Sequence, residues 1–380
     1  MKKLLLPALS LAVLGVGGTA HAQSSVALYG LIDAGITYTE NQGDSHNLQA
    51  TSGSVTGSRW GLRGAEDLGG GLKAIFTLEN GFSITNGKSG QNGSEFGRQA
   101  FVGLSSDQYG AVTLGRQYDS VVDYLAPLAL TGTSAGGTQA AHPFDNDNLN
   151  NSFRINNSVK YQSVNYGGLT VGALYGLSNQ AGGFDTNRAY SFGTSYDYGP
   201  VNVAAGYLQL NNAGATPNSS GAVTNDATFT AGRQRTYGAG VNYAVGPAKV
   251  GLVFTQTQLA NATGIGASAS GVTGGLALTG GSARFSNYEA NLRYNLTPAL
   301  SLSGAYTFTD AHLDDVRPKY QQVSLQTAYA LSKATNVYLM GVYQHVRDTG
   351  DSGLTADING LSASSSSTQV AATIGLRHQF

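Results

Sequence analysis

Two groups of charged side chains could act together on ions, judging by their types and spacing. Five basic residues sit in stretches where they alternate with apolar neighbours: Arg59, Arg63, Lys73, Arg98 and Lys160. Four acids share one long segment, residues 118–154: Asp119, Asp123, Asp145 and Asp147. Facing rows of opposite charge create a transverse field across a narrow passage, and such a field orients polar solutes and sets ion preference. The chemistry that these residues indicate is electrostatic.

Covalent chemistry finds little support in the sequence. The six histidines are scattered, and none shares a motif with a plausible serine or aspartate partner. H-E-x-x-H does not occur, and Gly132-Thr133-Ser134-Ala135-Gly136 matches G-x-S-x-G by spacing alone. Gly69-Gly70-Gly71-Leu72-Lys73 lacks the spacing of a phosphate loop. A calcium loop at residues 145–150 would need an oxygen ligand and a glycine where Leu149 and Asn150 stand. We therefore expect no enzyme activity, no cofactor and no metal.

Alternation assigns the basic side chains to one face of their strands. Within residues 58–63, Trp60 and Leu62 share one face, and Arg59 and Arg63 share the other. A charge that faces lipid is costly near the middle of a bilayer, so we expect the arginines to face an aqueous interior. The same argument sends the other strand bases inward, and these are Lys73 and Lys160.

Three arginines are harder to place. Arg98 is expected inward, although Ala100 and Val102 have the same parity. Strict alternation groups Arg116 with apolar neighbours, so either a bulge re-aims it or it lies above the membrane. Arg154 closes the long acidic segment and completes the basic set. Two interpretations stay open: a basic wall, or scattered charge that keeps a wet interior hydrated.

The elements that position these residues are strands. Alternating segments bounded by turn signals predict about 16 strands, joined alternately by short turns and by long polar loops. An even number of such strands is typical of a transmembrane antiparallel β-barrel. The long loops, which we expect to face outside the cell, include residues 40–57, 211–233 and 260–284. The predicted strands are residues 26–39, 58–66, 71–82, 97–105, 109–117, 155–165, 169–177, 188–196, 201–210, 234–245, 248–259, 285–296, 299–309, 320–331, 335–346 and a last strand that ends at Phe380.

Composition supports an all-β membrane protein. Glycine (53 residues) and tyrosine (21) are abundant, proline (8) is scarce, and charged residues make up 11%, against about 25% in soluble domains. After the N-terminal region, no apolar run reaches the roughly 18 to 20 residues of a membrane helix. The net charge of −1 argues against nucleic-acid binding.

The N-terminus predicts export. Met1-Lys2-Lys3 precedes an apolar run over residues 4–16, and Ala20-His21-Ala22 forms a small-x-small cleavage site. We expect residues 1–22 to be a cleaved signal peptide and residues 23–380 to form a single barrel domain.

Residues 118–154 differ from the other predicted loops because they combine acids with apolar groups. Val121-Val122 and the stretch 125–130 are too hydrophobic for an exposed loop. A segment folded back into the barrel could pack those side chains against the wall. Its acids would then face the arginines across a constriction. The alternative is that residues 145–148 are a solvated polar tip.

Three blocks carry a resemblance to a known family. Residues 25–35 (SVALYGLIDAG), residues 58–69 (SRWGLRGAEDLG) and residues 101–117 are similar to general-diffusion porins of Gram-negative bacteria, especially the betaproteobacterial and neisserial type. The resemblance implies a homotrimer of 16-stranded barrels in the outer membrane, each a water-filled pore narrowed by its third loop. It also implies passage of small hydrophilic solutes and ions, and contact with outer-membrane lipid and lipopolysaccharide.

The resemblance extends to particular residues. Arg59, Arg63 and Arg98 match inward arginines of the family, whereas the acids of residues 119–147 match only loosely because loop lengths differ. A terminal phenylalanine is read by the outer-membrane assembly machinery in this family, and Phe380 has that position. The surplus of inward bases favours anions.

Two other kinds of barrel compete with a general pore. A substrate-specific channel would use an aromatic slide, but most of the candidate tyrosines fit the interfacial girdles of any barrel: Tyr161, Tyr175, Tyr243, Tyr294 and Tyr329. An adhesin or structural barrel would have a closed lumen, whereas about 16 strands imply a wide one.

Overall fold

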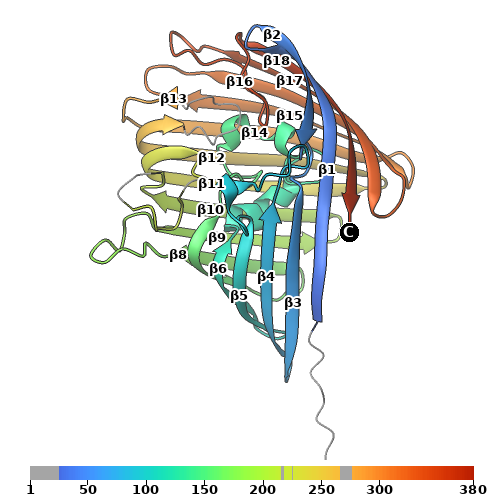
Figure 1. Cartoon of the computed structure of the whole chain (residues 1–380), viewed down its shortest axis with the longest axis vertical. Helices are drawn as coiled ribbons and strands as arrows, with labels where there is room; N and C mark the ends of the chain where they lie inside the picture. Colours follow the sequence, from blue (N-terminus) through green and yellow to red (C-terminus); the bar gives the residue numbers. More distant parts are fainter. Residues whose placement is uncertain (1–24, 215–217, 225, 266–275) are drawn as a thin grey trace, which may run out of the picture.

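The computed structural model describes residues 25–214, 218–224, 226–265 and 276–380, and the predicted signal peptide lies outside them. This part of the chain is mostly antiparallel strand (Figure 1), and none of its helices is long and apolar enough to cross a membrane. The strands are β1 (Ser25–Gln42), β2 (Ser45–Ser52), β3 (Arg59–Gly69), β4 (Leu72–Gly81), β5 (Gln99–Ser106), β6 (Gly110–Gln117), β7 (Ile155–Gln162), β8 (Leu169–Gly176), β9 (Ala189–Tyr198), β10 (Val201–Asn211), β11 (Phe229–Val245), β12 (Ala248–Ile265), β13 (Leu276–Ala277), β14 (Ala283–Asn295), β15 (Leu300–His312), β16 (Lys319–Ala330), β17 (Thr335–Arg347) and β18 (Thr368–Gln379).

The sheet closes on itself because its first and last strands pair. β1 runs antiparallel to β18, from Leu31 opposite Gln379 to Thr39 opposite Ala371. β2 and β3 both pair with β1, one after the other along its length, so together they fill one position in the ring. β13 only extends the pairing at the end of β12. The described residues therefore form a closed barrel of sixteen strands, which confirms the predicted fold.

The predicted loop over residues 40–57 is wrong in part, because it contains β2. A tight turn with positive φ at Gly43 and Asp44 folds the chain back, and Gln42 pairs with Ser45. β2 lacks the alternation of a membrane strand because its side chains are mostly polar. β11 and β12 likewise run into the predicted loops, beginning at Phe229 and ending at Ile265.

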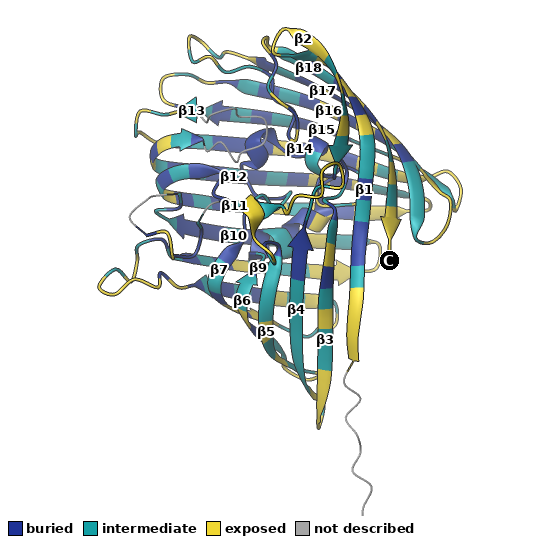
Figure 2. Cartoon of the chain, viewed as in Figure 1, coloured by how far each residue is buried: buried dark blue, intermediate teal, exposed yellow. Residues whose placement is uncertain are grey.

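The two faces of the barrel wall differ in polarity. Along β18, the apolar Ile374 is 61% exposed, whereas its neighbour Thr373 is fully buried. Figure 2 shows this alternation between buried and exposed residues along many strands. The exposed large side chains, such as Leu252 and Leu325, form an apolar face suited to lipid. The opposite face is polar and is largely buried by another part of the chain.

Residues 118–154 cover much of the polar face. They contain the π-helical turn η2 (Val121–Leu125) and the 3₁₀ turns η3 (Ala126–Leu128), η4 (Thr138–Ala140) and η5 (Pro143–Asp145); a further 3₁₀ turn, η1 (Gln91–Gly93), lies before β5. The apolar side chains Leu125 and Leu128 pack with Leu208 of β10 and Val253 of β12. Hydrogen bonds join the segment to polar-face groups of four strands: Ser191 of β9, Glu289 of β14, Gln322 of β16 and Thr373 of β18.

Candidate functional site

Charged and phenolic side chains form a compact group on the polar face between β4 and the start of residues 118–154. Arg98 lies just before β5 and donates from Nε to Glu79 Oε1 at 2.7 Å. Its Nη2 donates to the hydroxyl of Tyr118 at 2.9 Å. Arg154 places its guanidinium 5.6 Å from the centre of the Tyr118 ring. This contact brings two of the predicted basic residues, Arg98 and Arg154, to one place.

A cavity of about 410 Å³ adjoins this group. Four arginines line it, and we call it the arginine cavity: Arg59, Arg98, Arg154 and Arg377. Thr131, Thr133 and Asn150 of residues 118–154 line it from the other side. No carboxylate is among the described residues that line it. The site is therefore strongly basic at its surface.

Ring closure brings Arg377 of β18 to this cavity. Its Nη1 donates to Thr56 Oγ1 at 3.3 Å and to the carbonyl of Ser134 at 3.2 Å, so it bridges the wall and residues 118–154. Arg59 of β3 donates from Nε to the carbonyl of Gly57 at 3.0 Å, which turns its guanidinium toward the cavity.

Arg116 is re-aimed by a bulge, one of the two options that alternation left open. The pairing of β6 with β7 shifts register between Gly115 and Gln117, at Arg116 itself. The side chain then donates to Asn156 Oδ1 at 2.6 Å and pairs with Asp226 at 2.5 Å. Arg116 is thus neutralised by a loop acid from outside the predicted set.

Three more predicted bases lie apart from the arginine cavity. Lys160 pairs with Asp123 and donates to the carbonyl of Tyr118 at 3.1 Å. Arg63 sits over the ring of Tyr29 at 5.2 Å. Lys73 lies at the short-turn end of β4, where it pairs with Asp107 at 3.2 Å and is exposed.

The predicted acids of residues 118–154 are mostly buried, so they present little charge to the cavity. Asp119 accepts from Asn148 Nδ2 at 2.8 Å and from backbone N–H groups of η2. Asp145 accepts from the N–H groups of Asn150 and Ser152. Burial raises the pKa of Asp119 and of Asp145 to about 6 in each case. Burial and the neighbouring Arg98 lower the pKa of Arg154 to about 10, so that base stays charged at neutral pH.

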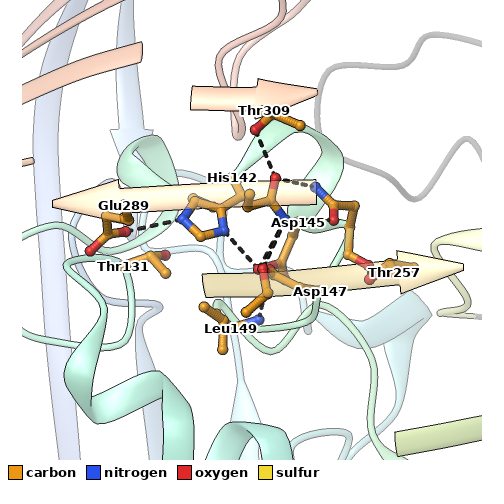
Figure 3. Close-up of polar contacts among 12 residues, drawn as sticks. Thr131, His142, Asp145, Asp147, Leu149, Thr257, Glu289 and Thr309 are labelled. Atoms are coloured by element: carbon orange, nitrogen blue, oxygen red, sulfur yellow. Dashed lines mark hydrogen bonds and ion pairs between the residues drawn. The ribbon is translucent and has the colours of Figure 1, made fainter. Parts of the chain in front are cut away.

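Asp147 belongs to a separate buried cluster around His142 (Figure 3). His142 Nδ1 lies 2.7 Å from Asp147 Oδ2, and its Nε2 lies 3.1 Å from Glu289 Oε2 of β14. Thr255 of β12 also donates to Asp147, at 2.5 Å, and the amide of Leu130 donates to Glu289 at 2.8 Å. Burial alone would lower the pKa of His142, but the Asp147 carboxylate, with help from Glu289, raises it to about 10. We call His142, Asp147 and Glu289 the His142 clamp.

The polarity of the two faces, the closed ring of sixteen strands and the basic cavity define a transmembrane β-barrel. The chain belongs to the Gram-negative porin family, whose sequence model matches residues 8–351.

Two relatives span nearly the whole chain. It is 35% identical over 377 residues to an outer membrane porin protein of Bordetella pertussis, covering 90% of this chain and 94% of that one. It is 31% identical to the outer membrane porin protein 32 of Delftia acidovorans, covering all of both chains.

Solved structures of porins share the fold. The anion-selective porin from Comamonas acidovorans has a TM-score of 0.73 and 24% identity, covering 94% of this chain and all of that one. OmpT of Vibrio cholerae in its trimer form has a TM-score of 0.66 and 15% identity, covering 94% of this chain and 99% of that one.

Proposed function

We propose that residues 118–154 fold into the channel and narrow it, and that small hydrophilic solutes and ions diffuse through the remaining opening. The observation that carries this proposal is the arginine cavity, which lies between the barrel wall and residues 118–154. Support also comes from the hydrogen bonds that tie the segment to β9, β14, β16 and β18, because these strands are spread around the ring.

We infer that the constriction prefers anions. Arg59, Arg98, Arg154 and Arg377 line the arginine cavity, and Glu79 is the acid held closely against Arg98. Asp119 and Asp145 do not line this cavity, because each is buried and hydrogen-bonded within residues 118–154. Rings of arginine favour anions in a pore because they attract the counter-ion. In this proposal the predicted acids mainly stabilise the conformation of residues 118–154.

The test is the zero-current potential across a bilayer in a salt gradient. We expect wild type to have an anion-selective potential, and Arg59→Ser with Arg377→Ser to move it substantially toward zero. A matched double variant, Lys73→Ser with Lys333→Ser, removes two charges beside short turns and should change the potential little. Cation preference in wild type, or equal shifts in both variants, would refute a basic constriction.

A substrate-specific channel is the alternative function. The tyrosines that could have formed an aromatic slide lie on the apolar face, where Tyr161, Tyr243 and Tyr329 are exposed. This placement favours general diffusion. Liposome swelling with a size series of sugars separates the two functions, because a smooth decline with solute size indicates general diffusion and saturation by one sugar indicates a specific site.

We infer a homotrimer, supported by family membership, and native mass spectrometry of the purified protein tests it.

Residues 1–22 act as the cleaved export signal, which N-terminal sequencing of the outer-membrane protein tests. Phe380 serves as the recognition signal for the assembly machinery, and deletion of this residue should lower the amount of assembled barrel. The six histidines are scattered along the sequence without a serine or aspartate partner in a shared motif, and this supports a channel without enzyme activity.

A further inference from the structure

Four glycines form a row across the polar face of four adjacent strands, β8 to β11. The strand register places Gly172 opposite Gly193, Gly193 opposite Gly206, and Gly206 opposite Gly238. We call these four residues the glycine row. Phe192, next to Gly193 in the chain, is 57% exposed on the apolar face, so alternation points the row toward the inside of the barrel.

The backbone conformation does not require glycine at these positions. None of the four has the positive φ that favours glycine, so an alanine could adopt the same strand conformation. Glycine inside a strand weakens the strand, and it often marks a site where another backbone approaches closely. Four such positions on neighbouring strands leave a furrow in the polar face of the wall.

The π-helical turn η2 occupies this furrow. A Cβ at Gly193 would lie 2.4 Å from Tyr124 Cδ2 and 2.9 Å from the carbonyl oxygen of Ser120. A Cβ at Gly206 would lie 3.1 Å from Val121 Cα. Ordinary contacts of a Cβ are 3.4–4 Å long, so η2 lies closer to the wall than any larger residue in the row would allow.

The same turn covers both ends of the glycine row. A Cβ at Gly172 would lie 2.4 Å from Tyr124 Oη, and one at Gly238 would lie 2.8 Å from Leu125 Cδ2. At Gly238 atoms of the neighbouring strand β12 are also close. At the other three glycines, the three nearest heavy atoms all belong to residues 120–124, so substitutions there act on η2 and not on the wall.

Polar contacts hold η2 against the wall. The N–H of Ser120 donates to Ser191 Oγ of β9 at 3.0 Å, and the two hydroxyls also lie 3.0 Å apart. Asp123 pairs with Lys160 of β7, and both side chains are mostly buried. These contacts restrain movement of η2 along the furrow. A side chain added inside the furrow would therefore push the turn away from the wall.

The opposite side of η2 faces the arginine cavity. Val122 of η2 and Ala126, which follows it, line that cavity. Arg59 of β3 and Arg377 of β18 line it from the wall, about half-way round the ring from β9 and β10. Because η2 lies between the glycine row and these arginines, its distance from the row determines the width of the arginine cavity.

We propose that the glycine row sets the width of the constriction, and with it the largest solute that passes, by letting η2 lie close to the wall. The glycines are positioning residues, because they act through η2 and do not touch the solute. The inference rests on the proposed diffusion pore. A Cβ at Gly193 requires a movement of about 1 Å, from 2.4 Å to the 3.4 Å of an ordinary contact, and the open direction is toward the cavity.

Single-channel conductance and liposome swelling of the purified full-length protein test the proposal. We expect Gly193→Ala to lower the conductance and to reduce the uptake of large sugars more than that of small ones, because pore diameter limits permeation. Gly206→Ala, where the contact is less close, should show a smaller loss of the same kind. The matched control is Gly341→Ala on β17, where a Cβ meets no heavy atom of the described residues within 4 Å, and it should behave like wild type.

The proposal also predicts that the effect depends on Tyr124. The ring of Tyr124 supplies two of the three atoms nearest to a Cβ at Gly193, so Tyr124→Ala removes most of the obstruction. Gly193→Ala should therefore lower the conductance less in a Tyr124→Ala background than in wild type. The zero-current potential should keep its sign in these variants, because the arginines are unchanged.

Three results would overturn the proposal: wild-type conductance and size dependence in Gly193→Ala, an equal effect of that substitution with and without the Tyr124 ring, or a higher conductance, which would mean that the row anchors η2 and does not set the width. A failure of the pore itself is distinguishable, because it abolishes current steps in wild type as well. If Gly193→Ala does not fold, Gly206→Ala takes its place, and conductance equal to wild type in that variant would refute the role of the glycine row.

Discussion

At the scale of single residues, the His142 clamp is a charged link between residues 118–154 and the barrel wall. His142 and Asp147 belong to the segment, whereas Glu289 belongs to β14, and all three side chains are buried. Because its pKa is about 10, the imidazole is protonated at neutral pH and can donate to both carboxylates. A buried charge of this kind holds a segment only while its partners remain ionised.

The clamp makes a prediction about pH. The pKa of His142 is raised above the usual value of 6.5, so its stabilisation is complete below about pH 6.5 and is lost as the pH rises through about 10. The pKa of Asp147 is lowered by the same pairing, so its share of the stabilisation is lost only below pH 3.8. We expect open-channel current noise to be steady between about pH 5 and 6.5 and to rise progressively from there toward about pH 10 as the segment loosens.

Replacing the histidine tests the assignment. His142→Gln leaves two buried carboxylates without a charged partner, which costs about 3–5 kcal/mol of stability. The variant should be noisy already at neutral pH and should lack the transition at high pH. His46→Gln, at an exposed position beside Tyr38, is the matched control and should behave like wild type. A quiet His142→Gln channel would show that the clamp does not hold the segment.

Alternation predicted the direction of several basic residues but not all members of the site. Arg59 lines the arginine cavity as the alternating pattern indicates. Arg98 lines it too, although its parity is that of Ala100 and Val102. The pattern also puts Arg377 on the polar side of the last strand. The local sequence does not predict that this strand contacts residues 118–154, because the contact forms only when the barrel closes. His142 and Glu289 are 147 positions apart, and no sequence motif around either residue predicts their contact.

At the scale of elements, the closure of the barrel depends on the fit of Phe380 against β1. The two backbones exchange hydrogen bonds, Gly30 N to Phe380 O at 2.9 Å and Phe380 N to Gly30 O at 3.1 Å. A Cβ at Gly30 would come within 2.3 Å of Phe380 Cζ and 2.8 Å of the Arg59 carbonyl. Only glycine lets the terminal ring lie this close to the strand.

Gly30→Val should therefore disturb the contact between Phe380 and β1, which we call the seam. We expect a destabilisation of about 1–3 kcal/mol, the usual cost of overpacking, and a lower urea midpoint for unfolding. Gly341→Val on β17 is the matched control, because a Cβ there meets no heavy atom within 4 Å. Equal midpoints for the two variants would mean that the seam tolerates a displaced ring.

Strand prediction worked where the membrane imposes alternation and failed where it does not. β3 to β10 were located to within a few residues, because a lipid-facing side chain at every second position is a strong constraint. β2 was missed, β11 was expected to begin later than it does, and β12 was expected to end earlier. These segments lie near the long connections, where lipid no longer imposes an apolar side chain on the outer face, so their sequences look like loops.

At the scale of the whole molecule, sixteen strands close into a ring, and residues 118–154 pack against its polar face. The ring was predictable from repeated alternation and from the rhythm of short and long connections. The apolar content of residues 118–154 predicted that the segment packs against something. Its path could not be predicted, because contacts with β9, β14, β16 and β18 are set by long-range pairing and not by local propensity.

The proposed pore is tested most directly by recording from the purified full-length protein in a planar bilayer. The account predicts stepwise current increases of uniform size, with a conductance that rises in proportion to bulk salt conductivity, because ions cross in water between the wall and residues 118–154. An absence of steps under conditions where the barrel is folded and inserted would contradict it.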